Sequence, residues 1–312
     1  MRPRTMVSAR LLFAIPFAVL ACSSVARAGA WLPARGEILS QVEASVFSSD
    51  SYYDATGARR PIGGLWEERT ILGSQEIGLK RHMSLRYTLP MASVTARGTG
   101  SSTSTGLSDL SLGLRYGLLQ GSSAAALSVD WSAPLGYDRW TSLLGEGLQQ
   151  LQGSLDAGAT VMDRGFVQGS AGFAYRYFSI TRKNNNDTGS PASEGFLRWA
   201  NLVTTSADAG WWVRPRLLVG GRYQGVATMS EGDGEPKRNL QLAGAFALLR
   251  ASEHLDVMAG SWSGFSGKYE LSTLGTAPAP PALHYDQVYV AVTFRQTRTN
   301  RLQGILGSNR QP

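Results

Sequence analysis

A two-residue alternation of apolar and polar side chains recurs along most of this chain and limits the folds that it can adopt. Between residues 109 and 118, Leu110, Leu112, Leu114 and Tyr116 alternate with small or polar residues. That period belongs to a β-strand with one apolar and one polar face. Such segments predict twelve strands, at 36–47, 69–79, 83–96, 107–119, 124–135, 150–162, 166–181, 196–209, 216–228, 239–249, 255–265 and 285–296.

The connections between the predicted strands alternate between long and short. The long ones, rich in residues that favour loops, are 48–68, 97–106, 136–149, 182–195, 229–238 and 266–284. The short ones are 80–82, 120–123, 163–165, 210–215 and 250–254. Every long connection therefore falls at one end of the sheet. The pattern predicts an all-β fold, an antiparallel up-and-down transmembrane β-barrel of about 12 strands, with long extracellular loops and short periplasmic turns.

Two all-β architectures compete for this pattern. A strand that crosses lipid must pair all its backbone groups, so a membrane sheet closes on itself, and about 9–11 tilted residues span the hydrocarbon core. A soluble β-sandwich would also alternate, but it does not need the long–short rhythm. Aromatic residues near the strand ends favour the barrel, because membrane barrels carry aromatic girdles; these are Tyr87, Tyr116, Trp131, Tyr175, Tyr177, Trp199, Tyr223 and Phe294.

The first 28 residues have the features of an export signal. Three arginines precede the apolar run 11–20, and Ala26-Arg27-Ala28 fits a small-x-small cleavage site. Cys22 offers lipidation as an alternative. Cleavage after Ala28 would remove the only cysteine and four arginines, lowering the formal net charge from +7 to +3. Export and this small charge argue against a nucleic-acid partner and predict the outer membrane of a Gram-negative bacterium.

Three parts of the chain are predicted from these signals: a signal peptide at 1–28, a barrel at 29–296, and a basic, disordered periplasmic tail at 297–312. The tail contains Arg298, Arg301 and Arg310 and no acidic residue. Contact with anionic lipid, peptidoglycan or a partner is the functional alternative for it.

The polar faces of the strands place charged residues in the predicted lumen. The acids are Glu43, Glu76, Asp109, Asp130, Asp156 and Asp208, and the bases are Arg86, Arg115, Arg176, Arg198 and Arg222. A nearly balanced set predicts ion pairs that brace the inner wall, because an unpaired charge in a narrow lumen is costly. A polar constriction that filters solutes is compatible with the same set. Small residues assigned to this face would leave room for a passage: Gly113, Gly158, Gly172, Ala174, Ala243, Ala245 and Ala247.

Catalysis and metal binding have little support in the sequence. The only histidines are His82, His254 and His284, and only His284, beside Asp286, falls at the extracellular end. No specific serine motif accompanies it, so an outer-membrane hydrolase is a remote alternative. The acidic segment 231–235 lacks EF-hand spacing and is interpreted as a solvated loop. We expect no metal and no cofactor.

One strand carries a family resemblance. Gly106-Leu-Ser-Asp-Leu-Ser-Leu-Gly-Leu-Arg-Tyr116 resembles the Gly-x-x-Asp-φ-x-φ-x-φ-Lys/Arg-Tyr strand (φ apolar) of an outer-membrane transporter family named for the MetA pathway of phenol degradation. The segments 31–37 and 173–177 resemble that family's mature N-terminus and its aromatic–Arg strand. The resemblance implies a 12-stranded barrel that passes hydrophobic or aromatic compounds.

Two functions follow as expectations. The first is a passive outer-membrane channel for small, hydrophobic or aromatic solutes, with membrane lipid and the solute as its partners. The second is a closed structural or adhesive barrel that acts through its extracellular loops. The loop candidates for recognition are Tyr52, Tyr53, Arg59, Arg60 and Trp66, an aromatic and basic mixture common at binding surfaces. The oligomeric state is not predicted.

Overall fold

The computed structural model describes residues 30–80, 82–97, 102–135, 137, 144, 149–181, 194–198, 200–229, 237–270 and 283–297. The predicted signal peptide and residues 298–312 of the predicted tail lie outside this set. The described residues form no helix, and so none that could cross a bilayer. The strands are β1 (Glu37–Tyr53), β2 (Arg59–Lys80), β3 (Met83–Arg97), β4 (Ser102–Leu107), β5 (Asp109–Leu119), β6 (Ser123–Pro134), β7 (Gln149–Val161), β8 (Gly165–Thr181), β9 (Glu194–Arg198), β10 (Leu202–Arg214), β11 (Leu217–Thr228), β12 (Lys237–Ser252), β13 (Leu255–Glu270) and β14 (Asp286–Thr297).

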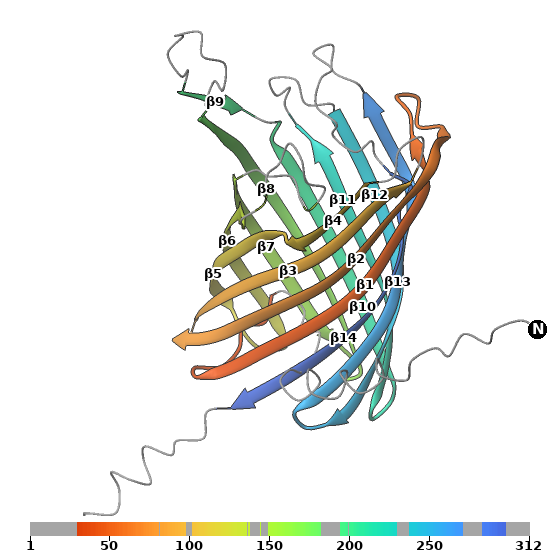
Figure 1. Cartoon of the computed structure of the whole chain (residues 1–312). Coiled ribbons are helices and arrows are strands. Elements are labelled where there is room, and N and C mark those ends of the chain that lie inside the picture. Colours follow the sequence, from red (N-terminus) through yellow and green to blue (C-terminus); the bar gives the residue numbers. More distant parts are fainter. Residues whose placement is uncertain are drawn as a thin grey trace, which may run out of the picture.

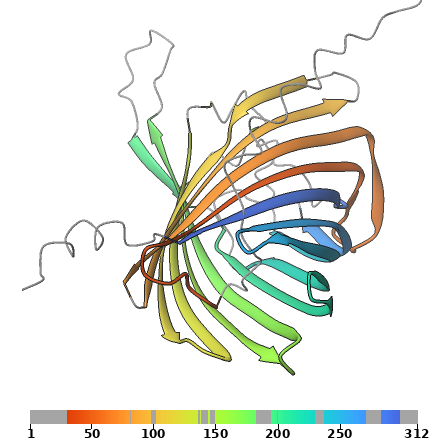
Figure 2. The ribbon, with the colours of Figure 1, turned by 90° about the horizontal axis from the view of Figure 1, so that it is seen from below.

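Twelve of these strands form a closed antiparallel ring (Figures 1 and 2). The order is β1-β2-β3-β5-β6-β7-β8-β10-β11-β12-β13-β14, and β14 pairs with β1. The remaining two strands extend the wall at the end that lies away from the short turns. β4 continues β5 along β3, and β9 continues β10 along β8. The predicted fold class and strand number are therefore confirmed.

The two ends of the barrel differ. Short turns connect the strands at one end, called here the turn end, and the other is called the loop end. The turn from β7 to β8 is tight because Met162 and Asp163 both have positive φ, at 47° and 52°, and Arg164 N donates to Val161 O. The chain thus reverses direction within the three residues between Val161 and Gly165, which pair across β7 and β8.

Several predicted connections differ from the structure. β4 occupies part of the predicted loop 97–106, and β10 continues to Arg214 through the predicted turn 210–215. The largest difference is at the tips of β1 and β2. The segment 48–68 was expected to be a long loop, but β1 and β2 run through most of it and pair up to Tyr53 and Arg59. Only residues 54–58 connect them. The strands thus extend past the length that a bilayer requires, because backbone pairing continues wherever the sequence permits an extended hairpin.

Alternate side chains point to opposite faces of the wall. Outward-facing leucines and valines are exposed, for example Leu112, Leu114, Leu127 and Val129. The same exterior carries the exposed rings of Tyr87, Tyr116 and Tyr175. The inner face of β2 to β8 is largely polar, so this part of the wall has the inverted pattern of a membrane barrel, apolar outside and polar inside.

The inner face of β11 to β14 is different. Leu218, Phe246, Leu248, Met258 and Tyr289 are buried there in one cluster with Ala291, and Phe166, Trp212 and Trp262 pack against it. The prediction that Ala243, Ala245 and Ala247 face the lumen is wrong. Phe246 and Leu248 face inward, and the three alanines lie on the outer face of the wall. Neither face of β12 carries a charged residue near these positions. The sequence of β12 alone therefore did not indicate which face is internal.

Candidate functional site: the barrel lumen

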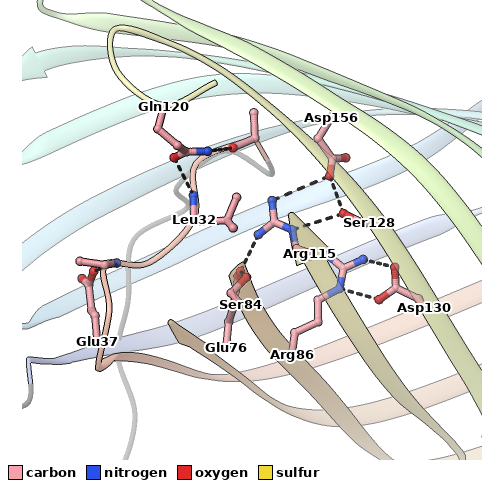
Figure 3. A network of polar contacts seen from close by, with 12 residues as sticks. Leu32, Glu37, Glu76, Ser84, Arg86, Arg115, Gln120, Ser128, Asp130 and Asp156 are labelled. Carbon is pink, nitrogen blue, oxygen red and sulfur yellow. Dashed lines mark hydrogen bonds and ion pairs between the residues drawn. The ribbon is translucent and has the colours of Figure 1, made fainter. Parts of the chain in front are cut away.

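Arg115 of β5 is the centre of a buried polar network (Figure 3). Its Nη1 lies 2.7 Å from Glu76 Oε1 on β2, and its Nη2 lies 3.8 Å from Asp156 Oδ2 on β7. Ser128 of β6 receives a hydrogen bond from Arg115 Nε and donates one to Asp156. Ser84 of β3 donates to Glu76. These contacts connect five neighbouring strands of the wall.

A second ion pair lies beside this network. Arg86 of β3 donates through Nε to Asp130 Oδ1 on β6 at 2.6 Å, and its Nη2 contacts the other carboxylate oxygen. The guanidinium therefore forms the two-pronged contact that fixes both side chains. The glycine between the two strands, Gly113, makes this possible, because a methyl group there would collide with Asp130 and Arg86.

A third pair lies on the opposite side of the ring. Arg222 Nε is 3.3 Å from Asp208 Oδ1, and Arg222 Nη1 donates to Tyr289 Oη at 2.9 Å. The guanidinium carbon also lies over the rings of Phe246, Trp262 and Tyr289, 5.1, 4.9 and 5.4 Å from their centroids. Contacts of this kind stabilise a cation among aromatic rings. Arg222 thus joins the polar wall to the apolar cluster.

The remaining predicted lumen residues do not form one site. Asp109 receives a hydrogen bond from Tyr137, and Arg176 is buried with its Nη1 donating to Ala200 O at 3.4 Å. Glu43 lies on β1, on the same face as Ser45. Arg198 lies in β9, and its side chain is outside the described residues. Leu144 packs on Ala92 and Val94 of β3 with Tyr137 nearby, which the sequence did not predict.

A polar cavity of about 480 Å³ opens between the ion pairs and the loop end. Its volume lies in the range of small-molecule sites. Five strands, β2, β3, β5, β6 and β7, and the adjoining part of β1 supply its lining. Besides the ion-paired Glu76, Arg86 and Asp130, the lining is dominated by hydroxyl and amide side chains, among them Gln41, Ser74, Thr88, Ser111, Ser132 and Gln150.

Residues 30–36, called here the strap, lie at the turn end before β1. Gln120, in the turn after β5, accepts from Leu32 N at 3.2 Å and donates to Ala30 O at 3.1 Å. Trp31 Nε1 donates to Gly121 O at 2.8 Å, and its ring packs against Gly158 of β7. In the ring of twelve, β7 is five strands from β1. The strap therefore crosses much of this mouth, as the red segment in Figure 2 shows.

The five candidates for a recognition loop lie on strands at the loop-end rim. The paired tips of β1 and β2 contain Tyr52, Tyr53, Arg59 and Arg60. Trp66 packs, as Tyr137 does, against the inner cluster that contains Val94 and Leu144. Arg60 pairs with Asp54 of the connecting turn at 2.8 Å. Arg59 and Arg60 are exposed at the end of this hairpin, whereas Tyr53 is buried.

The three histidines lie at the ends that the sequence indicates. His82 and His254 lie in turns at the turn end, and His284 lies at the loop end before β14. His284 Nδ1 is 2.9 Å from Tyr53 Oη, and its Nε2 is 3.3 Å from Asp286 Oδ2. The nearby Ser263 donates to Asp286 and not to the imidazole. Among the described residues, Ser263 is therefore not placed as a nucleophile paired with His284.

The residues described here include no group of three or more His, Cys, Asp or Glu side chains that could hold a metal ion. The acidic segment 231–235 lies outside the described residues. Every charged side chain in the cavity lining already has an ion-pair partner.

Solved structures with a similar fold are outer-membrane proteins. The COG4313 outer-membrane channel from Pseudomonas putida F1 matches with a TM-score of 0.68 and 13% sequence identity, over 88% of this chain and 100% of that chain. The NanC porin matches with a TM-score of 0.46 and 7% identity, over 82% and 98%. The CymD monoaromatic hydrocarbon channel matches with a TM-score of 0.43 and 8% identity, over 85% and 89%. No protein-family model and no curated protein matches the sequence. At these identities the likeness establishes the fold alone.

Proposed function

We propose that this chain is a passive outer-membrane channel for small solutes. The observation that carries the proposal is a polar cavity inside a closed barrel whose exterior is apolar. The strands β5, β6 and β7 have 11, 12 and 13 residues, which matches a tilted crossing of the hydrocarbon core. The cavity then provides a route through the membrane for a solute that lipid alone would exclude.

The membrane location rests on the exposed side chains. Large apolar residues such as Ile71, Leu127 and Val290 are about half exposed, which would be unfavourable over so much of a soluble protein's surface. We propose that the mature chain begins at Gly29 after signal cleavage and that the loop end is extracellular. The short turns and the strap would then face the periplasm.

The hydrophobic or aromatic solute predicted from the sequence is the finer form of this proposal. The apolar inner cluster of β11 to β14, with Trp262 and Tyr289, supports it. However, the side chains of that cluster are buried against one another, whereas the open cavity is lined by polar groups. The polar cavity is therefore the part of the lumen that first meets a passing solute.

A closed barrel is the second candidate, favoured by one observation. The strap crosses the turn-end mouth and is held there by the two hydrogen bonds of Gln120. If it blocked the lumen permanently, the barrel would act only through its surface. This reading makes the opposite prediction for ion flow, so one experiment separates the two.

The test is single-channel recording of the refolded chain that begins at Gly29, in a planar bilayer with potassium chloride. Heat-modifiable migration in a gel establishes that the barrel is folded. Stable conductance steps are expected, because water and small ions fit the polar cavity. A folded and inserted barrel that stays silent would contradict the channel and favour the closed barrel.

A further inference from the structure

Uncharged polar side chains form a continuous row inside the cavity. Gln41 lies directly opposite Ser74 across β1 and β2, and Ser74 lies opposite Thr88 across β2 and β3. The row continues through Ser111 and Ser132 to Gln150 on β7. These six residues, Gln41, Ser74, Thr88, Ser111, Ser132 and Gln150, are called here the polar belt. They occupy directly opposed positions on six consecutive strands of the ring.

Most of the hydrogen-bonding capacity of the belt is unused within the protein. Among the described residues, no side-chain hydrogen bond is formed by Gln41, Ser74, Thr88, Ser111 or Ser132. Gln150 Nε2 donates one hydrogen bond to Gln152 Oε1 at 3.2 Å. Hydroxyl groups both donate and accept and rotate to suit a partner. The belt therefore presents an array of adaptable groups to whatever fills the cavity.

The charges beside the belt do not compete for a ligand. Arg86 is held by both oxygens of Asp130, and Glu76 is held by Arg115 and Ser84. An ion entering the cavity would give up part of its hydration without meeting an unpaired counter-charge. The arrangement thus favours neutral molecules over ionic ones.

We propose that the polar belt is a binding site for uncharged solutes rich in hydroxyl groups, of about the size of a mono- or disaccharide. The proposal rests on the proposed channel function and names the solute class of the same lumen. Each solute hydroxyl replaces a water at the belt, so hydrogen bonds are exchanged and not lost. A hydrocarbon would displace water from these groups without forming hydrogen bonds to them, so its binding here is unfavourable.

The test measures block of the single-channel current by added solutes. Maltose and glucose are the probes, glucuronate is the charged comparison, and toluene is the hydrocarbon comparison. The variant Ser74→Ala/Thr88→Val/Ser111→Ala/Ser132→Ala removes four belt hydroxyls. Because each bond contributes modestly, we expect the concentration of maltose for half block to rise about tenfold or more.

Matched controls separate the belt from the rest of the lumen. Ser170 and Ser206 face each other across β8 and β10, on the lumen face but outside the cavity. The variant Ser170→Ala/Ser206→Ala should change half block by less than about twofold, as expected for side chains remote from the site. Heat-modifiable migration and potassium chloride conductance check that each variant folds and inserts.

Liposome swelling supplies a second readout that needs no variant. Uptake of glucose should exceed uptake of glucuronate after correction for size. A channel that conducts ions while maltose neither blocks nor permeates would overturn the belt proposal and leave the channel function standing. Block by maltose that is unchanged in the belt variant, or tighter block by toluene than by maltose, would also overturn it. A folded barrel without ion conductance would overturn both proposals.

Discussion

Arg115 and Glu76 form an ion pair at 2.7 Å although β3 lies between the strands that carry them. The guanidinium reaches over Ser84, which itself donates to the same carboxylate. The Arg115 side chain is 3% exposed. An arginine this deeply buried is retained only when its charge is balanced by well-placed acceptors. The pair therefore braces the wall below the cavity.

Removal of one partner of this pair should destabilise the barrel. We expect Arg115→Met to lower the free energy of unfolding by about 3–5 kcal/mol, because Glu76 and Asp156 would be left buried without a cation. Urea unfolding in detergent micelles or lipid vesicles, followed by tryptophan fluorescence, measures the change. The double variant Arg115→Met/Glu76→Gln should recover part of the loss. An Arg115→Met barrel as stable as the original would refute the brace.

Gly113 should tolerate no side chain. A methyl group there would collide with Asp130 Oδ1 and with the Arg86 side chain, so Gly113→Ala must displace the ion pair. We expect a loss of about 1–3 kcal/mol in the unfolding free energy, typical of overpacking. Gly153→Ala on β7 is the matched control, because no heavy atom lies within 4 Å of the added methyl. Equal stability of the two variants would contradict this account.

The strap should open when Gln120 is shortened. Gln120→Ala removes both hydrogen bonds that hold Ala30 and Leu32, a loss of about 2 kcal/mol in total. We expect a higher single-channel conductance or a larger open fraction. In a chain expressed from Gly29, Ala30→Cys supplies a unique thiol, and its labelling by a maleimide should accelerate about tenfold. Gln75→Ala, whose side chain faces outward, is the control that should leave labelling unchanged.

The sequence predicted the barrel well because one physical rule governs most of its strands. In a membrane barrel, outward groups contact lipid and inward groups contact water or each other, and the resulting period of two is visible without any tertiary information. The same period assigns Arg86, Arg115 and Asp130 to one face of the sheet. It could not pair them, because partners on strands two positions apart depend on the register between the strands.

Other features depended on contacts between distant parts of the chain. The inward face of β12 is set by register with Arg222 of β11, and neither of its parities is charged near Phe246. The strap follows from contacts between Leu32 and Gln120, which are 88 residues apart. The polar belt required the opposition of six strands before its hydroxyls could be seen as one row. Such features become visible only when the strands are aligned.

The turn at the tip of β1 and β2 gives a prediction about pH. Asp54 accepts hydrogen bonds from Thr56 and Arg60, which lower its pKa below the usual range. Its Oδ1 also accepts from Ala58 N at 2.9 Å, so the ionised form holds the turn together. Since the folded pKa lies below the unfolded value of about 3.9, the stabilisation is present above about pH 4 and is lost as the pH falls through the folded pKa.

Hydrogen exchange of residues 54–58, corrected for the intrinsic rate at each pH, measures this stabilisation. Protection in the original chain should stay constant from about pH 7 to pH 5 and should weaken only at lower pH, where Asp54 gains a proton. Asp54→Asn should weaken protection throughout that range, because a neutral amide replaces the charged acceptor of Thr56 and Arg60. Asp163→Asn, in the turn between β7 and β8 at the other end of the barrel, should leave it unchanged. Loss of protection in the original chain between pH 7 and pH 5 would show that another titrating group holds this turn.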